Sequence, residues 1–177
     1  IAIIGSGIVG LTQAALLAKQ NLKIICIDRK LPCVKKLDLT NWDMRVSAIT
    51  PTSTKIWDDL GIWDEIKNLR AHPFKKMHVW DEKSNAHIDF CANSMGQDYL
   101  GHLVENKVIT HALFKKLIDT SDIEFLQDDL LDLKYENSSE YNSEYKWEIK
   151  TKNSDSIYTK LLIGADGANS FVRQKAK

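Results

Sequence analysis

The sequence predicts an α/β fold of the Rossmann-like type, built on a parallel sheet. The first observation is the glycine pattern GSGIVG at residues 5–10, which lies between an apolar run at residues 1–4 and a helix-like stretch over residues 11–20. The second observation is another apolar run, residues 22–27, which ends at Asp28. A strand, a glycine turn, a helix and a second strand ending in an acidic residue form the dinucleotide-binding unit of such folds.

Each glycine of this turn has a physical role in a dinucleotide fold. Gly5 would permit the tight turn, Gly7 would let the backbone approach a pyrophosphate, and Gly10 would let the helix pack closely on the strand. The pyrophosphate would lie on the unpaired N–H groups of the helix, where the helix dipole is positive. Asp28 stands where this fold places an acid on the adenosine ribose. A glycine-rich turn in an ordinary α/β protein is the alternative.

The composition argues against several classes of protein. The chain has 177 residues, with 24 Lys and Arg against 24 Asp and Glu, so its net charge is zero and no basic surface for nucleic acid is indicated. Its three cysteines, Cys26, Cys33 and Cys91, form no CxxC motif, which predicts reduced thiols in a cytoplasmic protein. No apolar stretch approaches the roughly 18 to 20 residues of a membrane span, so we expect a soluble protein, with contact at a membrane surface left open.

The middle of the chain predicts two short helices. Residues 29–49 show no regular pattern, and we expect an irregular segment there. A helix over residues 50–60 is expected because Thr50 suits the N-cap and Pro51 suits the first helical position. A second short helical segment follows at residues 62–69.

Strands dominate the rest of the chain. Runs at residues 77–80 and 87–90, separated by the turn at residues 81–85, predict a hairpin. Residues 106–118 return to helical spacing. A polar loop is expected at residues 136–144. The remaining short apolar runs predict five strands: residues 123–126, 131–135, 145–150, 156–158 and 161–163.

A second strand-to-turn motif lies near the end of the chain. The apolar run at residues 161–163 leads into GADG at residues 164–167, and a helix start follows at residue 171. Because the carboxyl ends of parallel strands share one edge of a sheet, both glycine turns would face the same crevice. A single Asp-Gly pair is common in turns, so this motif alone indicates little.

Two further segments accompany the two turns. Residues 45–49 read RVSAI, and residues 99–106 read YLGHLVEN. With the turn at residues 5–10 and the segment GADGANSFVR at residues 164–173, they make four ordered motifs that span the chain. Together these motifs closely resemble the class A flavoprotein aromatic hydroxylases, the p-hydroxybenzoate hydroxylase-like family, and particularly its ubiquinone-biosynthesis branch.

The resemblance implies a Rossmann-like FAD-binding domain with a small β-meander and the start of an inserted substrate-side β-sheet. The first part of the FAD-binding domain would be residues 1–72, the substrate-side hairpin residues 73–100, and the second part of the FAD-binding domain residues 101–177. The chain begins inside its first predicted strand and stops soon after a helix start. We therefore expect the C-terminal remainder of such a protein to be absent, and the fragment alone to be inactive.

The resemblance also implies which residues bind FAD. Gly5, Gly7 and Gly10 would contact the pyrophosphate, and the backbone N–H groups of Ile8 and Val9 would point at it. In that family NAD(P)H reduces FAD, and the reduced flavin uses O2 to hydroxylate an electron-rich ring. The protein supplies position, electrostatics and exclusion of water, so no catalytic residue is predicted.

Five other residues receive roles from the same resemblance. Asp28 would bind the adenosine ribose, and Leu130 would bracket the adenine through its backbone. Arg45 would neutralise charge at the pyrophosphate or the flavin, and Asn106 would donate a hydrogen bond to the same region. Asp166 would hold the ribityl side of FAD. A solvated surface charge remains the alternative for Arg45, and a helix N-cap remains the alternative for Asn106.

The implied substrate is a small aromatic molecule, a prenylated phenol or benzoquinol, and O2 is the second reactant. The implied setting is peripheral contact with the inner membrane, or a biosynthetic complex. The five histidines form no i, i+4 helical pair, so no metal site is predicted. An NAD-dependent dehydrogenase is one alternative, because GxGxxG with Asp28 serves NAD and FAD equally. A non-catalytic flavin-binding fragment is the other.

Overall fold

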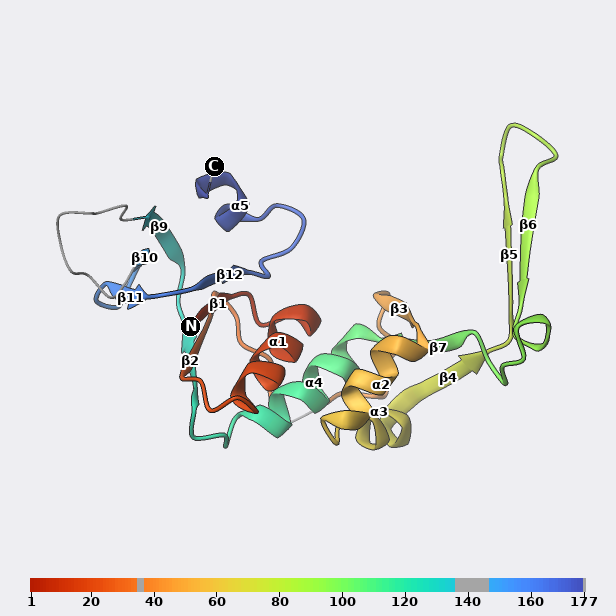
Figure 1. Cartoon of the computed structure of the whole chain (residues 1–177), viewed down its shortest axis with the longest axis horizontal. Coiled ribbons are helices and arrows are strands. Elements are labelled where there is room, and N and C mark those ends of the chain that lie inside the picture. The colour runs from red at the N-terminus through yellow and green to blue at the C-terminus, as the bar shows by residue number, and fades with distance from the viewer. Residues whose placement is uncertain (35–36, 136–146, 177) are drawn as a thin grey trace. The chain divides into compact units, whose positions relative to one another are not determined.

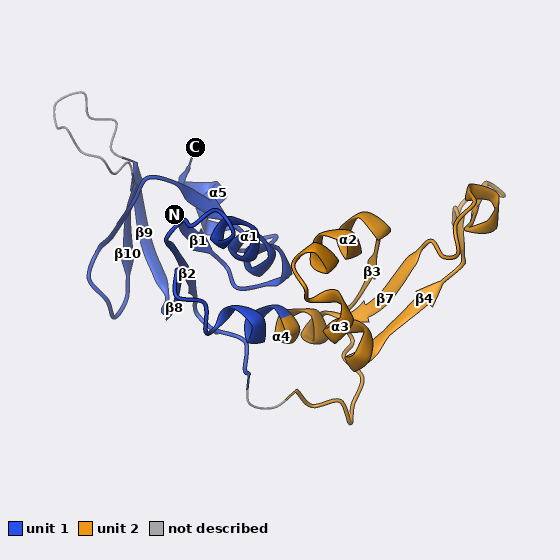
Figure 2. Cartoon of the chain, turned by 60° about the horizontal axis from the view of Figure 1, so that its bottom comes forward, with its two compact units in different colours: residues 1–36, 113–177 blue, residues 37–112 orange. Residues whose placement is uncertain are grey.

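The computed structural model describes residues 1–34, 37–135 and 147–176. The chain divides into two compact units (Figure 2): unit 1 comprises residues 1–36 and 113–177, and unit 2 comprises residues 37–112. Among the described residues, unit 1 contains a four-stranded and a three-stranded sheet, and unit 2 contains a three-stranded and a two-stranded sheet.

Unit 1 contains a parallel sheet with the strand order β12-β1-β2-β8. Strand β1 (Ala2–Ile4) pairs with β12 (Leu162–Gly164) on one side and with β2 (Ile24–Asp28) on the other, and β2 pairs with β8 (Ile123–Gln127). Helix α1 (Ile8–Ala18) connects β1 to β2. The carboxyl ends of these parallel strands therefore lie at one edge of the sheet, where open α/β folds bind their ligands.

An antiparallel meander packs against this sheet in unit 1 (Figure 1). Its strands are β9 (Leu130–Tyr135), β10 (Trp147–Thr151) and β11 (Ile157–Thr159), in the order β11-β10-β9. The short helix α5 (Phe171–Lys175) follows β12. The buried core that joins these elements consists of apolar side chains from the sheet, the meander and α5: Ala2, Ile4, Ile27, Leu133, Ile149 and Val172.

Unit 2 is built on an antiparallel sheet with the strand order β3-β7-β4. Strand β7 (Gly101–Glu105) lies in the centre, between β3 (Val46–Ile49) and β4 (Ala71–Phe74). Helices α2 (Pro51–Asp59) and α3 (Trp63–Arg70) connect β3 to β4. The last residue of β7, Glu105, lies where the chain passes from the sheet into the next helix.

An aromatic cluster lies among the aliphatic side chains of the core of unit 2. The rings of Trp57 and Trp63 lie 6.2 Å apart. The ring of His102 lies edge-on to Trp63 at 5.0 Å and to Tyr99 at 4.6 Å, so this histidine is held within an aromatic environment. Helix α4 (Asn106–Leu117) begins directly after β7.

A two-stranded hairpin extends away from β4 and β7 (Figure 1). It pairs β5 (Lys76–Trp80) with β6 (His87–Cys91), and the 3-10 helix η1 (Asn93–Met95) follows. The hairpin exposes several large apolar side chains: Met77, Val79, Trp80, Ile88 and Phe90. The hairpin predicted from the sequence is therefore present, with an apolar surface that the pattern alone did not reveal.

The predicted α/β class is confirmed, and the predicted helices correspond to α2, α3 and α4 within a few residues. The expectation of an irregular segment over residues 29–49 is wrong for residues 46–49, which form β3. Strands β4 and β7 were also not predicted. Pro73 interrupts the apolar pattern of β4, but proline is tolerated there because β4 is an edge strand that needs fewer backbone donors.

The structure does not test two other expectations. The polar loop expected at residues 136–144 lies outside the described residues. The functional division at residues 1–72, 73–100 and 101–177 stays a prediction, because the two compact units describe packing and not the role of each part.

Candidate functional site

The glycine turn between β1 and α1 is built so that little space remains around two of its glycines. Gly5 has φ +106°, and a Cβ on it would lie 2.4 Å from the backbone oxygen of Ala165. A Cβ on Gly10 would lie 1.9 Å from the backbone oxygen of Gly5. These contacts are with backbone atoms, which cannot move aside as a flexible side chain could. Gly5 and Gly10 are therefore required by packing, as the sequence predicted for a tight turn and a close helix.

Gly7 differs from its two neighbours in the motif. Beyond its chain neighbours, no atom of the described residues lies within 4 Å of the place a Cβ on Gly7 would occupy. Gly7 is also exposed, and its φ of −77° is open to any residue. Packing within the protein therefore gives no reason for a glycine here. A ligand that approaches the backbone closely would give one.

Helix α1, which the structure describes in full, begins without a cap. Gly7 is its N-cap residue and provides no side-chain acceptor, and the first turn carries no acidic residue. The first hydrogen bond that closes the turn is donated by Leu11 N–H to Gly7 O at 3.0 Å. The N–H groups of Ile8 and Val9 therefore precede the helical ladder and have no acceptor within it. This end of α1 can bind an anion.

The second strand of the predicted unit ends at Asp28, and its carboxylate bonds to the glycine turn. Oδ2 of Asp28 accepts hydrogen bonds from Ser6 N–H at 2.6 Å and from Ser6 Oγ at 2.8 Å. Oδ1 accepts one from Lys30 N–H at 3.1 Å. Ser6 is only 3% exposed. Asp28 thus fixes the turn as well as standing at the edge where a ribose is predicted. The sequence did not reveal Ser6 as its partner, because the two lie on different elements.

The GADG turn lies beside the glycine turn. Strand β12 pairs with β1 so that Gly164 lies opposite Ile4, and Ala165 N–H donates to Ile4 O at 2.8 Å. The two motifs therefore share one edge of the sheet. The Asp166 carboxylate accepts hydrogen bonds from Ser170 Oγ at 2.6 Å and from Val172 N–H at 3.1 Å. Asp166 therefore holds the start of α5 against the turn.

Leu130 begins β9 and packs against the core of unit 1. The turn before it is anchored by Asp128, which is 4% exposed and accepts hydrogen bonds from Asn153 N–H at 2.9 Å and from Asn153 Nδ2 at 2.8 Å. Burial alone would raise the pKa of Asp128, but hydrogen bonds from the backbone N–H groups of Asn153 and Asp129 and other donors lower that pKa to about 2. Asp128 N–H also donates to Asp28 O at 3.0 Å, which ties this turn to the end of β2.

Arg45 and Asn106, the two predicted residues in unit 2, are joined to each other. Asn106 N–H donates to Arg45 O at 2.9 Å, and Asn106 Oδ1 accepts a hydrogen bond from Ser47 Oγ at 2.6 Å. Arg45 N–H donates to Asp43 Oδ1 at 3.0 Å. The structure thus brings Gly5, Gly7, Gly10, Asp28 and Asp166 to one edge in unit 1, and Arg45 and Asn106 to one place in unit 2.

A family model matches the sequence over the whole chain. It is described as an FAD binding domain, and the match covers residues 1–177. The chain belongs to the FAD binding domain family. This confirms FAD as the predicted cofactor and favours it over the NAD-dependent dehydrogenase considered from the sequence. The residues at the edge of unit 1 fit FAD, since the open space at Gly7 and the uncapped start of α1 suit its pyrophosphate.

Curated relatives of this FAD binding domain match it along nearly its full length. The chain is 38% identical over 185 residues to the ubiquinone biosynthesis monooxygenase COQ6, mitochondrial, of Danio rerio, covering 99% of the chain and 38% of that protein. It is 34% identical over 177 residues to the 3-demethoxyubiquinol 3-hydroxylase of Escherichia coli (strain K12), covering 99% of the chain and 43% of that protein. The predicted resemblance to the ubiquinone-biosynthesis branch is confirmed. The chain spans about two fifths of the length of these relatives.

Solved structures share the fold. The p-nitrophenol 4-monooxygenase PnpA of Pseudomonas putida DLL-E4 has a TM-score of 0.71 at 19% identity, covering 99% of this chain and 42% of that one. The flavin-dependent monooxygenase PieE, solved in complex with FAD and substrate, has a TM-score of 0.71 at 16% identity, covering 99% of this chain and 31% of that one. At these identities the likeness establishes the fold alone, and it agrees with the α/β class derived from the sequence.

Proposed function

We propose that this chain is the FAD-binding part of a monooxygenase that hydroxylates the ring of a prenylated phenol or benzoquinol in ubiquinone biosynthesis, with NAD(P)H and O2. The observation that carries the proposal is the match along 99% of the chain to relatives named as ubiquinone biosynthesis monooxygenase and 3-demethoxyubiquinol 3-hydroxylase. The four ordered sequence motifs and the adjacent glycine turns support the same function.

When bound, FAD supplies the redox chemistry and the activation of O2, and the chain supplies binding and orientation. We assign the pyrophosphate to Gly7 and to the N–H groups of Ile8 and Val9, because they form an open helix start with no acceptor in the helix. Gly5 and Gly10 shape this turn by excluding any side chain. Removing water from this edge would strengthen the hydrogen bonds to the phosphates.

Asp28 receives two roles in this proposal. One carboxylate oxygen already accepts two hydrogen bonds from Ser6, while the other accepts one from Lys30 N–H. A carboxylate offers about four acceptor sites, so capacity remains for a ribose hydroxyl of the adenosine. Asp28 would therefore bind the ribose and hold the phosphate-binding turn at the same time.

The other predicted contacts rest on placement at the ends of strands. Asp166 would orient the turn before α5 and accept a hydrogen bond from the ribityl chain of FAD, since its carboxylate has acceptor capacity beyond Ser170 and Val172. Leu130 would bracket the adenine with its backbone. Arg45 would balance a negative charge of the cofactor, and Asn106 would support it from the start of α4.

A prenylated substrate favours an enzyme that works at a membrane surface. The described helices include none that is long and apolar enough to cross a bilayer. Peripheral contact, directly or through a biosynthetic complex, would deliver such a substrate. Sedimentation of the complete protein with phospholipid vesicles would test the contact, and a protein that stays in the supernatant at every lipid composition would argue against it.

Visible absorption of the complete, purified protein tests the cofactor. A flavin band that survives desalting is expected, and its absence would contradict the assignment. Oxidation of NADPH and NADH is then measured with and without a prenylated phenol. We expect the phenol to accelerate oxidation and to appear as a hydroxylated product. Flavin retention without any such reaction would favour the alternative, a non-catalytic flavin-binding protein.

A further inference from the structure

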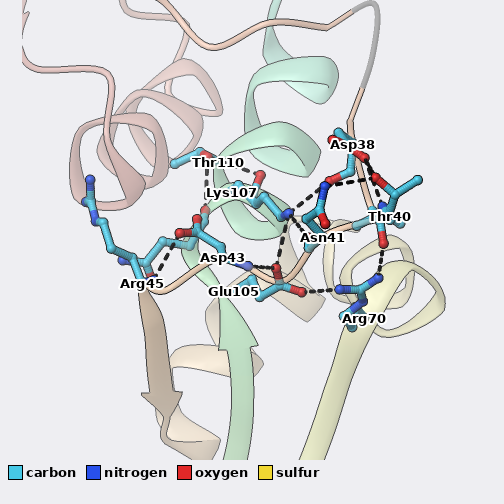
Figure 3. A network of polar contacts seen from close by, with 11 residues as sticks. Asp38, Thr40, Asn41, Asp43, Arg45, Arg70, Glu105, Lys107 and Thr110 are labelled. Atoms are coloured by element: carbon cyan, nitrogen blue, oxygen red, sulfur yellow. Dashed lines mark hydrogen bonds and ion pairs between the residues drawn. The ribbon is translucent and has the colours of Figure 1, made fainter.

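A buried carboxylate lies at the end of the central strand of unit 2 (Figure 3). Glu105 is only 2% exposed and accepts three hydrogen bonds. Asp43 N–H donates to Oε2 at 2.6 Å, Arg70 Nη1 donates to Oε1 at 2.7 Å, and Lys107 Nζ lies 3.3 Å from Oε2. A buried carboxylate is stable only when charged partners and donors surround it, and here they do.

The same two cations also hold a stretch of backbone. Lys107 Nζ donates to Asp38 O at 2.8 Å and to Asn41 O at 2.6 Å, and Arg70 Nη2 donates to Leu39 O. With the bond from Asp43 N–H to Glu105, these contacts fix four backbone groups of residues 38–43. This stretch contains no helix or strand, so side chains take the place of a regular hydrogen-bond ladder.

Burial alone would raise the pKa of Glu105, but its hydrogen bonds from Asp43, Arg70 and Lys107 outweigh burial and hold that pKa below its usual value. Glu105 is therefore ionised at neutral pH and balances charge on Arg70 and Lys107. The guanidinium of Arg70 is further held by the ring of Trp42, at 4.0 Å from the ring centroid. Arg70 and Lys107 are therefore both already paired with groups of the protein.

Arg45 lies directly beyond this fixed stretch. Its N–H donates to Asp43 Oδ1 at 3.0 Å, and its O accepts from Asn106 N–H at 2.9 Å, so its backbone is held on both sides. Its side chain is exposed and extends away from the network in Figure 3. Its guanidinium makes no hydrogen bond or ion pair with any residue that the structure describes. Arg45 therefore combines a fixed backbone with an uncommitted cation.

We propose that Glu105 is a positioning residue for ligand binding: it fixes residues 38–43 so that Arg45 presents its guanidinium to an anionic group of the ligand. The inference rests on the proposed function for the identity of that anion, a phosphate of FAD. Fixing the backbone beforehand removes part of the entropy that ordering the segment on binding would otherwise require. Glu105 also keeps Arg70 and Lys107 occupied, so within the network of Figure 3 Arg45 is the cation that stays available to the ligand.

A double-mutant cycle on the complete protein tests this coupling. Arg45→Gln should raise the Kd of FAD about tenfold, the loss typical of a charged hydrogen bond, and Glu105→Gln should raise it by a similar factor. If Glu105 acts through Arg45, Glu105→Gln should add little in the Arg45→Gln background. Asp64→Asn is the matched control, because Asp64 forms an exposed ion pair with Lys67 in the same unit, and its Kd should equal wild type.

Wild-type affinity in Glu105→Gln, or full additivity in the double variant, would overturn the proposal. A purely structural role for Glu105 predicts that additive outcome. If Glu105→Gln fails to fold, Lys107→Met replaces it in the cycle. That change removes the bonds to Asp38 O and Asn41 O but keeps the pair between Glu105 and Arg70, and it should show the same dependence on Arg45.

Amide hydrogen exchange separates this inference from the proposed function, because it needs no flavin. Exchange at residues 38–45 should be at least about tenfold faster in Glu105→Gln than in wild type, and unchanged in Arg45→Gln and Asp64→Asn. Unchanged exchange in Glu105→Gln would refute positioning even if FAD binds. Faster exchange in a protein that binds no FAD would support the positioning step and refute only the proposed cofactor.

Discussion

The two candidate binding regions are held in shape by different kinds of contact. In unit 1, the glycine turn is shaped by backbone against backbone, and a Cβ on Gly10 would lie 1.9 Å from the carbonyl oxygen of Gly5. In unit 2, the stretch before Arg45 is held by side chains, chiefly Glu105 and Lys107. Backbone contacts cannot relax, whereas ion pairs weaken by degrees. The first region should therefore fail sharply on substitution at Gly5 or Gly10, and the second should respond gradually to substitution.

Gly10→Val should produce the largest effect of any single change. The added side chain must displace the backbone of Gly5, so we expect unit 1 to lose about 3 kcal/mol or more of stability and the protein to lose its FAD. Urea denaturation and the flavin band after desalting measure the two losses. A variant that unfolds at the wild-type urea concentration would show that α1 can move away from the turn, against the close packing described here.

Gly7→Ala is the matched comparison within the same turn. Its Cβ would enter open space, and its φ of −77° suits alanine, so stability should stay within about 0.5 kcal/mol of wild type. FAD affinity should fall by at least about tenfold, because the methyl group would stand where the pyrophosphate approaches the backbone. Isothermal titration with FAD measures this. Equal FAD affinity in Gly7→Ala and wild type would show that the pyrophosphate does not approach the backbone of Gly7.

Asp28→Ala separates ribose binding from support of the turn. Loss of the carboxylate should weaken FAD binding by about 1 to 3 kcal/mol. Ser6→Ala removes only the hydroxyl that donates to Asp28 at 2.8 Å, and should weaken binding by about 1 kcal/mol if Asp28 acts partly by fixing the turn. Isothermal titration of both variants with FAD distinguishes ribose binding by Asp28 from its support of the turn. Wild-type affinity in Ser6→Ala would show that the hydroxyl bond to Asp28 does not contribute to FAD binding, and would leave only the backbone N–H of residue 6 to couple Asp28 to the turn.

The same contrast explains what the sequence could predict. The turn at residues 5–10 was predictable because its three glycines lie close together in the chain, directly between an apolar run and a helix-like stretch. The network around Glu105 was not, because Arg70 lies 35 residues away and Asp43 lies 62 residues away. Nothing in the pattern of charges says which acid meets which base after folding. Strand β3 was missed because it is only four residues long, too short for its apolar residues Val46, Ala48 and Ile49 to show a strand pattern.

Ser6 shows a second limit of prediction from sequence. Position 6 lies between two glycines whose roles were expected, yet its hydroxyl and N–H both bond to Asp28 across 22 residues. Asp28 was predicted from its place at the end of the second strand, and the dinucleotide-binding motif predicts that it binds the ribose. Its support of the turn depends on the parallel pairing of β1 with β2, which only the folded sheet provides.

Lowering the pH should reduce the stability of the two units in different pH ranges, and this loss of stability should be smaller than that caused by the substitutions. Burial in the aromatic core lowers the pKa of His102 from its usual 6.5, and the charges of Lys67 and His72 lower it further. The unfolded state therefore binds more protons below pH 6.5, so the contribution of His102 to unit 2 is present above that pH and is lost as the pH falls. In unit 1, Asp128 contributes above its usual pKa of 3.8 and loses that contribution as the pH falls toward about 2.

Urea denaturation between pH 7 and pH 3, followed by tryptophan fluorescence, tests this order, because Trp147 in β10 reports on unit 1, whereas Trp57 and Trp63 report on unit 2. The rings of Trp57 and Trp63 lie in unit 2 near His102, so their transition should move to lower urea as the pH falls below 6.5. His102→Phe keeps a ring in the aromatic core but cannot titrate, and should remove that pH dependence.

Asp128→Asn should leave the unfolding transition near pH 6 unchanged. It should reduce only the loss of stability below pH 4, because an amide does not titrate. A transition that shifts equally in wild type and His102→Phe would place the acid sensitivity of unit 2 on other titratable groups.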